Sequence, residues 1–128
     1  MIPKFRAWLK EEKRMTDVHE MTFMDGEVYL ISDITGFYAY EEFKLMQSTG
    51  LKDKNGNEIF ESDIVKYKSG CNTYTEEVAY DKNFAGFGVR DVNADIIFTF
   101  WELAEDIDLI SLEVVGNKYE NPELLKGE

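Results

Sequence analysis

Two short turn signals, Asp25-Gly26 and Asn55-Gly56, constrain the fold of this chain more than any other feature of its sequence. Each pair lies between two apolar runs, and glycine tolerates the positive φ angle that tight hairpin turns require. Most of the remaining chain consists of short apolar or alternating segments separated by turn residues; they are residues 4–9, 18–24, 27–31, 63–68, 74–81, 84–92 and 111–116. This pattern predicts a mainly β protein, an antiparallel bent sheet or barrel-like structure.

Three segments suggest helical structure or leave the type open. "DIIFTFWEL" (95–103) is too short an apolar run to distinguish a buried strand from a buried helix. Residues 40–47 and 120–125 are expected to form one or two short helical turns, the second with Asn121 as N-cap and Pro122 at its first position. We expect this C-terminal turn to dock on the domain with Leu124 and Leu125 facing inward.

Length and composition predict one domain over residues 1–128. Hydrophobic residues make up 44% of the chain and aromatic residues 14%, which is enough apolar surface for a core. In one arrangement of that domain, residues 1–44 form a smaller N-terminal sheet packed on a barrel-like part over residues 45–128. The chain has a single cysteine and no stretch typical of a signal peptide or membrane span, so we expect a cytoplasmic protein.

The charge balance bears on possible partners. The chain carries 14 basic and 26 acidic residues, a net charge of −12. This excess of acid opposes direct binding to nucleic acid phosphates and to anionic membranes. Residues 91–113 hold seven acids and neither Lys nor Arg, whereas residues 4–14 are rich in both. The acidic stretch is therefore either a solvated surface or a face that meets a basic partner, and its candidate binding residues are Glu102, Glu105, Asp106 and Asp108.

Residues 53–64 resemble a calcium-binding loop only in part. Asp53, Asn55 and Asn57 match the first three ligand positions of an EF-hand. Glu58 stands where the loop needs glycine, and Ile64 stands where it needs a bidentate glutamate. The segment is better explained as a hairpin whose turn is supported by Asp53 and Asn57, and we expect no metal site and no cofactor.

Other residues offer weak catalytic alternatives. His19 and Cys71, the single histidine and the single cysteine, could form a base–nucleophile pair, but no supporting motif surrounds either residue. Glu102 and Glu105 would share a face if their segment were helical, and could then act as an acid–base pair or hold Mg²⁺. A surface turn is the simpler reading of both glutamates, and the aromatic residues are expected to pack in the core. We therefore expect no catalytic residues.

Three segments together resemble one family. They are "LMQSTGLKDKNGNEIFESDIVKY" (45–67), the opening "KFRAWLKEEKRM" (4–15) and the closing "EVVGNKYENPELL" (113–125). The combination resembles the YopX family, small proteins of bacterial phages and prophages. The resemblance implies a mostly β fold, a phage or prophage origin and self-association into a homo-oligomer, and it implies no known activity. The family usually has glycine before the "D-I-V" motif, where this chain has Ser62; if that glycine serves a positive φ angle, Ser62 must adopt it with strain.

Three functions remain open at this point. The first is a non-enzymatic protein-interaction module that binds a host or phage protein. The second is an acidic mimic of nucleic acid that inhibits a host DNA-binding protein, and the third is a small enzyme with a carboxylate site. An interaction module would show an apolar patch rimmed by charge, a mimic would show rows of carboxylates on a convex face, and an enzyme would show carboxylates converging in a pocket.

Overall fold

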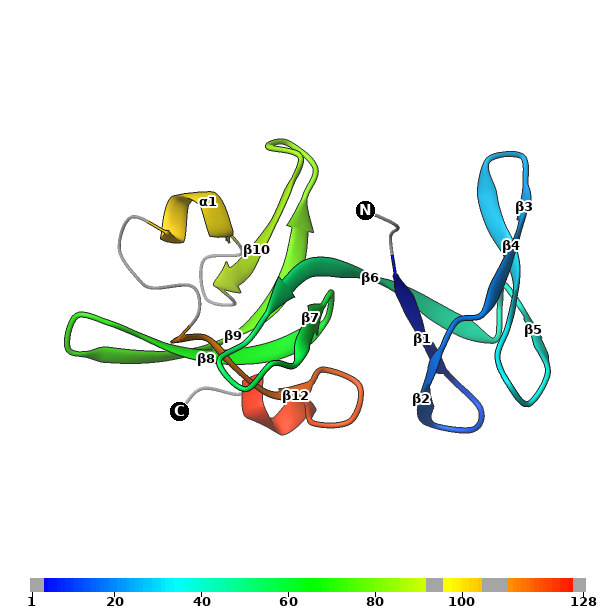
Figure 1. Ribbon diagram of the computed structural model, residues 1–128, viewed down its shortest axis with the longest axis horizontal. Helices are drawn as coiled ribbons and strands as arrows, with labels where there is room; N and C mark the ends of the chain where they lie inside the picture. The colour runs from blue at the N-terminus through cyan, green and yellow to red at the C-terminus, as the bar shows by residue number, and fades with distance from the viewer. Residues whose placement is uncertain (1–3, 92–95, 105–110, 126–128) are drawn as a thin grey trace. The chain divides into compact units, whose positions relative to one another are not determined.

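The computed structural model describes residues 4–91, 96–104 and 111–125. The chain divides into two compact units, residues Met1–Ser48 (unit 1) and Thr49–Glu128 (unit 2). Nearly all regular structure is antiparallel β, which confirms the predicted fold class (Figure 1).

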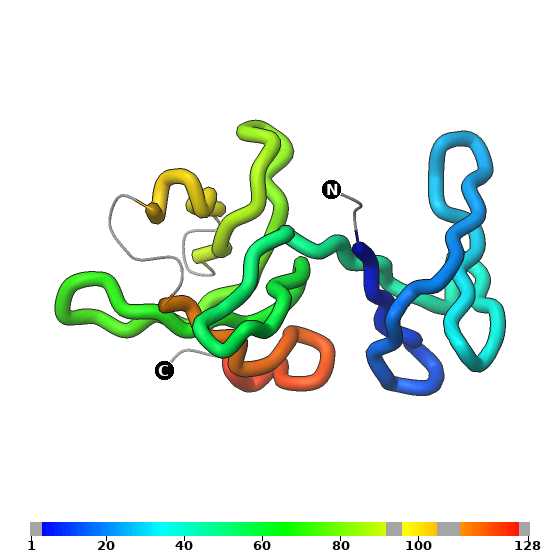
Figure 2. Tube along the Cα trace, viewed as in Figure 1, coloured from blue at the N-terminus to red at the C-terminus, as the bar shows by residue number. Residues whose placement is uncertain are grey.

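Unit 1 is built from short hairpins. Its strands are β1 (Phe5–Leu9), β2 (Arg14–Asp17), β3 (Glu20–Met24), β4 (Glu27–Ser32), β5 (Phe37–Ala39) and the first part of β6 (Phe43–Lys52). β1 pairs with β2 on one side and with β6 on the other, and β3, β4 and β5 form a separate three-stranded sheet. Figure 2 traces the successive reversals of the chain through these hairpins.

The Asp25-Gly26 turn has the predicted conformation. Asp25 has a φ angle of 54° and Gly26 one of 83°, both positive as a type I′ turn requires. The turn joins β3 to β4, whose register places Met24 opposite Glu27. The hairpin prediction is therefore confirmed in its turn as well as in its strands.

The prediction of a short helix over residues 40–47 is wrong. This segment enters β6, and Phe43 pairs with Leu9 of β1. Phe43 and Leu9 are both buried in the core of unit 1, with Ala7 and Ile31. The helix-compatible composition of the segment is outweighed by pairing with β1, a tertiary contact that local propensity does not contain.

Unit 2 is dominated by one curled sheet. The strands of the whole unit are the last part of β6, β7 (Glu58–Phe60), β8 (Asp63–Ser69), β9 (Asn72–Asp81), β10 (Gly86–Asp91), β11 (Ile96–Thr99) and β12 (Glu113–Asn117). The five-stranded sheet has the order β11-β10-β9-β8-β12 and curls as a half-barrel. Unit 2 also contains the short helix α1 (Phe100–Leu103) and the 3₁₀ turn η2 (Pro122–Leu125).

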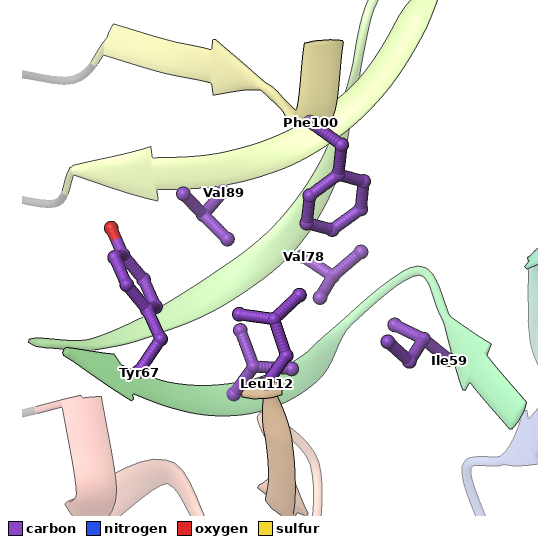
Figure 3. Close-up of a cluster of buried hydrophobic side chains, with 7 residues drawn as sticks. Ile59, Tyr67, Val78, Val89, Phe100 and Leu112 are labelled. Atoms are coloured by element: carbon purple, nitrogen blue, oxygen red, sulfur yellow. The ribbon is translucent and has the colours of Figure 1, made fainter. Parts of the chain in front are cut away.

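The core of unit 2 lies against this sheet and beneath α1. Its buried members are Ile59, Val65, Tyr67, Val78, Val89, Phe100 and Leu112. Tyr67 lies at one end of this cluster and Ile59 at the other, with Phe100 reaching in from α1 (Figure 3). The apolar run 95–103, whose type the sequence leaves open, contains both a strand and a helical turn: β11 ends at Thr99, and α1 begins directly after it.

Close backbone packing explains one glycine of β10. A Cβ atom at Gly88 would lie 2.1 Å from the carbonyl oxygen of Phe98. The two strands pair without a break in register from Gly88 to Asp91. Gly88 therefore permits β11 to approach β10, rather than marking a bend or bulge.

The C-terminal turn forms as a short helix, but its leucines are not buried. η2 begins at Pro122, as predicted. Leu124 is exposed and Leu125 is half-buried, so the expectation that both face inward is wrong. The side chain of Asn121 points back along the chain, where its Oδ1 accepts a hydrogen bond from the backbone N–H of Asn117 at 3.2 Å. That bond ties the turn to β12. Asn121 keeps the predicted N-cap position, because its carbonyl accepts from the backbone N–H of Leu124 at 3.1 Å.

Candidate functional site

The segment that resembles a calcium loop is a hairpin turn. The backbone N–H of Gly56 donates to the carbonyl of Asp53 at 3.0 Å, and the N–H of Asp53 donates to the carbonyl of Asn57 at 2.8 Å. Gly56 has a φ angle of 86°, in the left-handed region that glycine favours. The turn joins β6 to β7, as the Asn55-Gly56 signal predicts.

The carboxylate of Asp53 holds this turn and a distant strand together. The side chain is 5% exposed. Its Oδ1 accepts from the backbone N–H groups of Asn55 at 2.9 Å and Asn57 at 2.8 Å, and its Oδ2 accepts from that of Val114 in β12 at 2.9 Å. Burial raises the pKa of this carboxyl, but the backbone donors outweigh burial and hold the pKa below its usual range. Both oxygens of Asp53 are thus engaged by the protein itself.

Unit 1 contains a second buried aspartate, Asp33, that sequence reasoning missed. Its Oδ1 accepts from the backbone N–H groups of Thr35 and Gly36 at 2.8 and 3.0 Å. Its Oδ2 accepts from the Thr16 hydroxyl at 2.7 Å and from Nη2 of Arg14 at 3.2 Å. Burial opposes ionisation, yet these donors hold the pKa of Asp33 well below its usual range. The signal in the sequence was the "D-I-T-G" turn, in which an aspartate accepts from the N–H groups that follow it.

A third buried carboxyl, Glu76, has the opposite electrostatics. It lies on β9 and accepts a 2.5 Å hydrogen bond from the hydroxyl of Tyr67, whose ring stacks on Tyr74 at 5.5 Å between centroids. Burial raises the pKa of Glu76, the Tyr67 hydrogen bond lowers it, and the nearby charge of Asp91 raises it further; the net shift is upward. Burial also raises the pKa of Tyr67. The sequence already shows Glu76 among apolar residues on one face of its strand. In the structure, the hydroxyl of Tyr67 gives this buried carboxyl a hydrogen-bond donor.

The residues proposed from sequence as a catalytic pair lie in different units. His19 is exposed, and its backbone N–H donates to the carbonyl of Ser32 within unit 1. Cys71 is exposed in the turn between β8 and β9 of unit 2. Over residues 4–91, 96–104 and 111–125, no group of three or more His, Cys, Asp or Glu side chains is placed to hold a metal ion.

Glu102 is the one member of the candidate acidic face among the described residues. Its Oε1 accepts from the backbone N–H and the hydroxyl of Thr99, both at 3.0 Å, while its own N–H donates to the Thr99 hydroxyl at 3.2 Å. This reciprocal arrangement is a capping box that starts α1. Glu105, Asp106 and Asp108 lie outside the described residues.

An aromatic groove opens beside that capping box. Trp101 is 87% exposed and Phe84, in the turn before β10, is 74% exposed. Both line a groove of about 570 Å³ together with Leu51, Phe87 and Glu102, among others. We call this surface the Trp101 groove. Its lining comes from three separate parts of unit 2, which is why no single stretch of sequence revealed it.

Comparison with known proteins supports the fold. The model of the family described as "YopX protein" matches residues 4–126. A crystal structure of protein EF1440 from Enterococcus faecalis is similar, with 33% sequence identity, coverage of 98% of this chain and 99% of the other, and a TM-score of 0.73. An X-ray structure of protein yopX from Bacillus subtilis has 19% identity, coverage of 95% and 97%, and a TM-score of 0.65. A search of curated proteins finds no match.

Proposed function

This chain belongs to the YopX family, and we propose that it is a phage- or prophage-derived module that binds another protein and catalyses no reaction. The observation that carries the proposal is the Trp101 groove. Large aromatic side chains exposed together on a surface mark interaction sites, because leaving them in water forgoes the free energy of burial. Trp101 is such a residue, since only 13% of its surface is covered while the adjacent Phe100 is buried in the core.

The buried carboxyls of both units support binding over catalysis. Asp33 and Asp53 each accept with one oxygen from turn N–H groups and with the other oxygen from groups outside the turn. Glu76 accepts with one oxygen from the hydroxyl of Tyr67. A catalytic carboxyl must reach a substrate from a cleft. These three side chains serve as internal acceptors instead, and so does a fourth buried carboxyl, Asp63, which accepts from the backbone N–H of Phe60 at 2.8 Å.

The proposed occupant of the Trp101 groove is a protein segment that presents an apolar side chain next to a basic one. The apolar requirement follows from the aromatic lining, and the basic requirement follows from Glu102 at the groove and from the net charge of −12. Within the described ranges, no helix has the length and apolar character needed to cross a membrane. We propose a cytoplasmic location for the interaction on a separate ground, the single cysteine of the sequence.

The test compares capture of proteins by matched variants. The chain is immobilised and exposed to lysate of its bacterial host, alongside Phe84→Ser/Trp101→Ser and a control that alters two exposed apolar residues of unit 1, Ile34→Ser/Phe37→Ser. We expect one protein to be retained by the parent and by the control, and lost from the groove variant. Equal retention by the groove variant contradicts the proposal, provided that all three chains give the same circular dichroism spectrum.

The role of charge can be separated from that of the aromatic residues. Glu102→Gln removes the charge but keeps the side-chain oxygen that the capping box uses. With the captured partner in hand, this variant should associate more slowly than the parent at low salt and equally fast at high salt. The triple variant Glu105→Gln/Asp106→Asn/Asp108→Asn then measures what the rest of the acidic face adds. If the partner is instead a second copy of this chain, the molar mass of the purified protein in solution should rise with its concentration.

A further inference from the structure

Unit 1 has a second groove, whose lining differs in chemistry from the Trp101 groove. It has a volume of about 650 Å³ and lies beside the β3–β4 turn. Its walls include Tyr29 and Tyr40, whose ring centroids lie 5.7 Å apart with planes inclined by 32°. We call it the tyrosine groove.

Apolar side chains form part of the tyrosine groove. Val28 of β4 and Leu45 of β6 line it and also pack against the core of unit 1. Met24, at the end of β3, adds a flexible and polarisable wall and is itself exposed. These side chains offer a surface on which the methylene groups of a long side chain can lie.

Acidic residues complete the lining. Asp25 and Glu27 flank Gly26 in the β3–β4 turn and both line the groove. The described residues that line it include these two carboxylates and neither Lys nor Arg. The potential in the groove therefore favours a cation, and the protein's net charge of −12 adds to that preference.

We propose that the tyrosine groove binds a lysine or arginine side chain presented by a segment of another protein. The aliphatic stem lies on Val28 and Leu45, the cationic end lies over the faces of Tyr29 and Tyr40, and Asp25 and Glu27 accept from its N–H groups. Aromatic faces attract cations through the ring quadrupole, and long basic side chains bury their stems while keeping the charged end near water. This inference does not rest on the Trp101 groove, which lies in the other unit and is lined by other residues.

The size of the groove favours a protein segment over a free amine. A volume of about 650 Å³ falls in the range of sites that hold drug-sized ligands, and it exceeds what one side chain fills. The residues that flank the basic side chain would occupy the remainder. The occupant is thus a short basic peptide segment.

The test is a binding titration followed by ¹⁵N chemical shifts of the full chain. The probes are the capped peptide Leu-Lys-Leu, the same peptide with arginine at the centre, and the same peptide with uncharged norleucine at the centre. We expect the two basic peptides to shift the amides of residues 24–29 and 40–45, with at least about tenfold weaker binding of the norleucine peptide. An equal response to all three peptides overturns the proposal. So does an equal affinity for n-butylammonium, which would define a small-amine site.

Variants distinguish the groove from general attraction to an acidic protein. Tyr29→Leu/Tyr40→Leu removes both ring faces and leaves the net charge unchanged, so it should abolish the localised shifts. Asp25→Asn/Glu27→Gln should weaken the basic peptides, and asparagine tolerates the positive φ angle at position 25. The control Glu11→Gln/Asp17→Asn makes the same change of charge elsewhere in unit 1 and should bind as the parent does. Equal affinities for the tyrosine variant and the parent would show that the attraction is only a property of overall charge.

Discussion

Asp33 in unit 1 and Asp53 in unit 2 are both buried turn aspartates, but their hydrogen-bond donors differ. Asp33 receives side-chain donors from Arg14, Thr16 and Thr35 in addition to two local N–H groups. Asp53 receives mainly backbone N–H groups, one of which belongs to Val114, 61 residues away. Side chains can turn toward water when their acceptor is lost, whereas backbone N–H groups inside a turn cannot. We therefore expect the kind of donor, side chain or backbone, to decide how much each buried carboxylate contributes to the free energy of unfolding.

The largest expected effect follows from removing Asp53. Asp53→Ala removes the acceptor of three part-buried hydrogen bonds, those from the N–H groups of Asn55, Asn57 and Val114, and an unsatisfied buried group costs about 1–3 kcal/mol. We expect unit 2 to lose roughly 3–5 kcal/mol of unfolding free energy. Asp33→Ala should cost unit 1 less, because three of its donors are side chains. Urea titration with residue-resolved hydrogen exchange measures the two units separately, and an equal loss in both would break the comparison.

Close packing gives the next largest contrast. Gly88→Ala would place a Cβ atom 2.1 Å from the carbonyl oxygen of Phe98 in β11, and that backbone cannot yield as a flexible side chain would. Overpacking of this kind costs about 1–3 kcal/mol, so β10 and β11 should separate and unit 2 should melt earlier. The matched change in unit 1 is Gly36→Ala, where the new Cβ atom has no heavy atom within 4 Å. Calorimetry should show a lowered transition for the first variant and no shift for the second.

The dependence of stability on pH should also differ between the units. The folded pKa of Asp33 and of Asp53 is lowered, so each carboxylate stabilises the fold above its unfolded pKa of about 3.9, and this contribution is lost as pH falls below that value. The folded pKa of Glu76 is raised, so its contribution has the opposite sign: stability falls as pH rises from about 4.3 toward the folded pKa.

Glu76→Gln tests that difference in sign. It keeps an oxygen that can accept from Tyr67 but cannot ionise, so unit 2 should become more stable at pH 7 than the parent and lose its decline above pH 4.3. Unit 1 should be unaffected. Melting curves of parent and variant from pH 3 to 8 are the measurement, and an unchanged slope above pH 4.3 would show that Glu76 is not destabilised by burial.

The smallest expected effect concerns Ser62. Ser62 has a φ angle of 70°, in the left-handed region. Glycine, the usual residue here in the family, adopts this region without strain, whereas serine is strained in it. Ser62→Gly should stabilise unit 2 by roughly 0.5–1 kcal/mol, since relief of strain exceeds the entropy that glycine adds to the unfolded chain. Ser48→Gly, at a buried serine within β6 that does not have a positive φ angle, should instead destabilise the chain. A loss of stability in both variants would show that the Ser62 hydroxyl outweighs its backbone strain.

Much of the fold could be predicted because its signals are local. Asp25-Gly26 and Asn55-Gly56 each specify a turn through the conformation of one or two residues. The alternation of Val65 and Tyr67 likewise specifies a buried strand face. The prediction failed where a distant partner decides the structure, as at residues 40–47, where pairing with β1 favours a strand over a helix.

The candidate sites were less predictable for the same reason. The Trp101 groove unites residues of β6, of the β9–β10 turn with the start of β10, and of α1 with the preceding Thr99. The tyrosine groove unites residues of three strands and two turns. Sequence reasoning assigned the aromatic residues to the core, which is right for Tyr67 and Phe100 but wrong for the exposed Trp101. Adjacent residues of a helical turn, such as Phe100 and Trp101, point about 100° apart, so one can be buried while the next is exposed. Which of them is covered depends on the rest of unit 2.

The proposal that the chain binds another protein through the Trp101 groove is tested most directly by site-specific photo-crosslinking in bacterial cells that express the chain. A photoreactive phenylalanine derivative replaces Trp101 in one variant and Ile34 in the other; both positions are 87% exposed, one in each unit. We expect one discrete crosslinked protein from position 101 that is absent from position 34. No discrete product from position 101, or the same product from both positions, would contradict it.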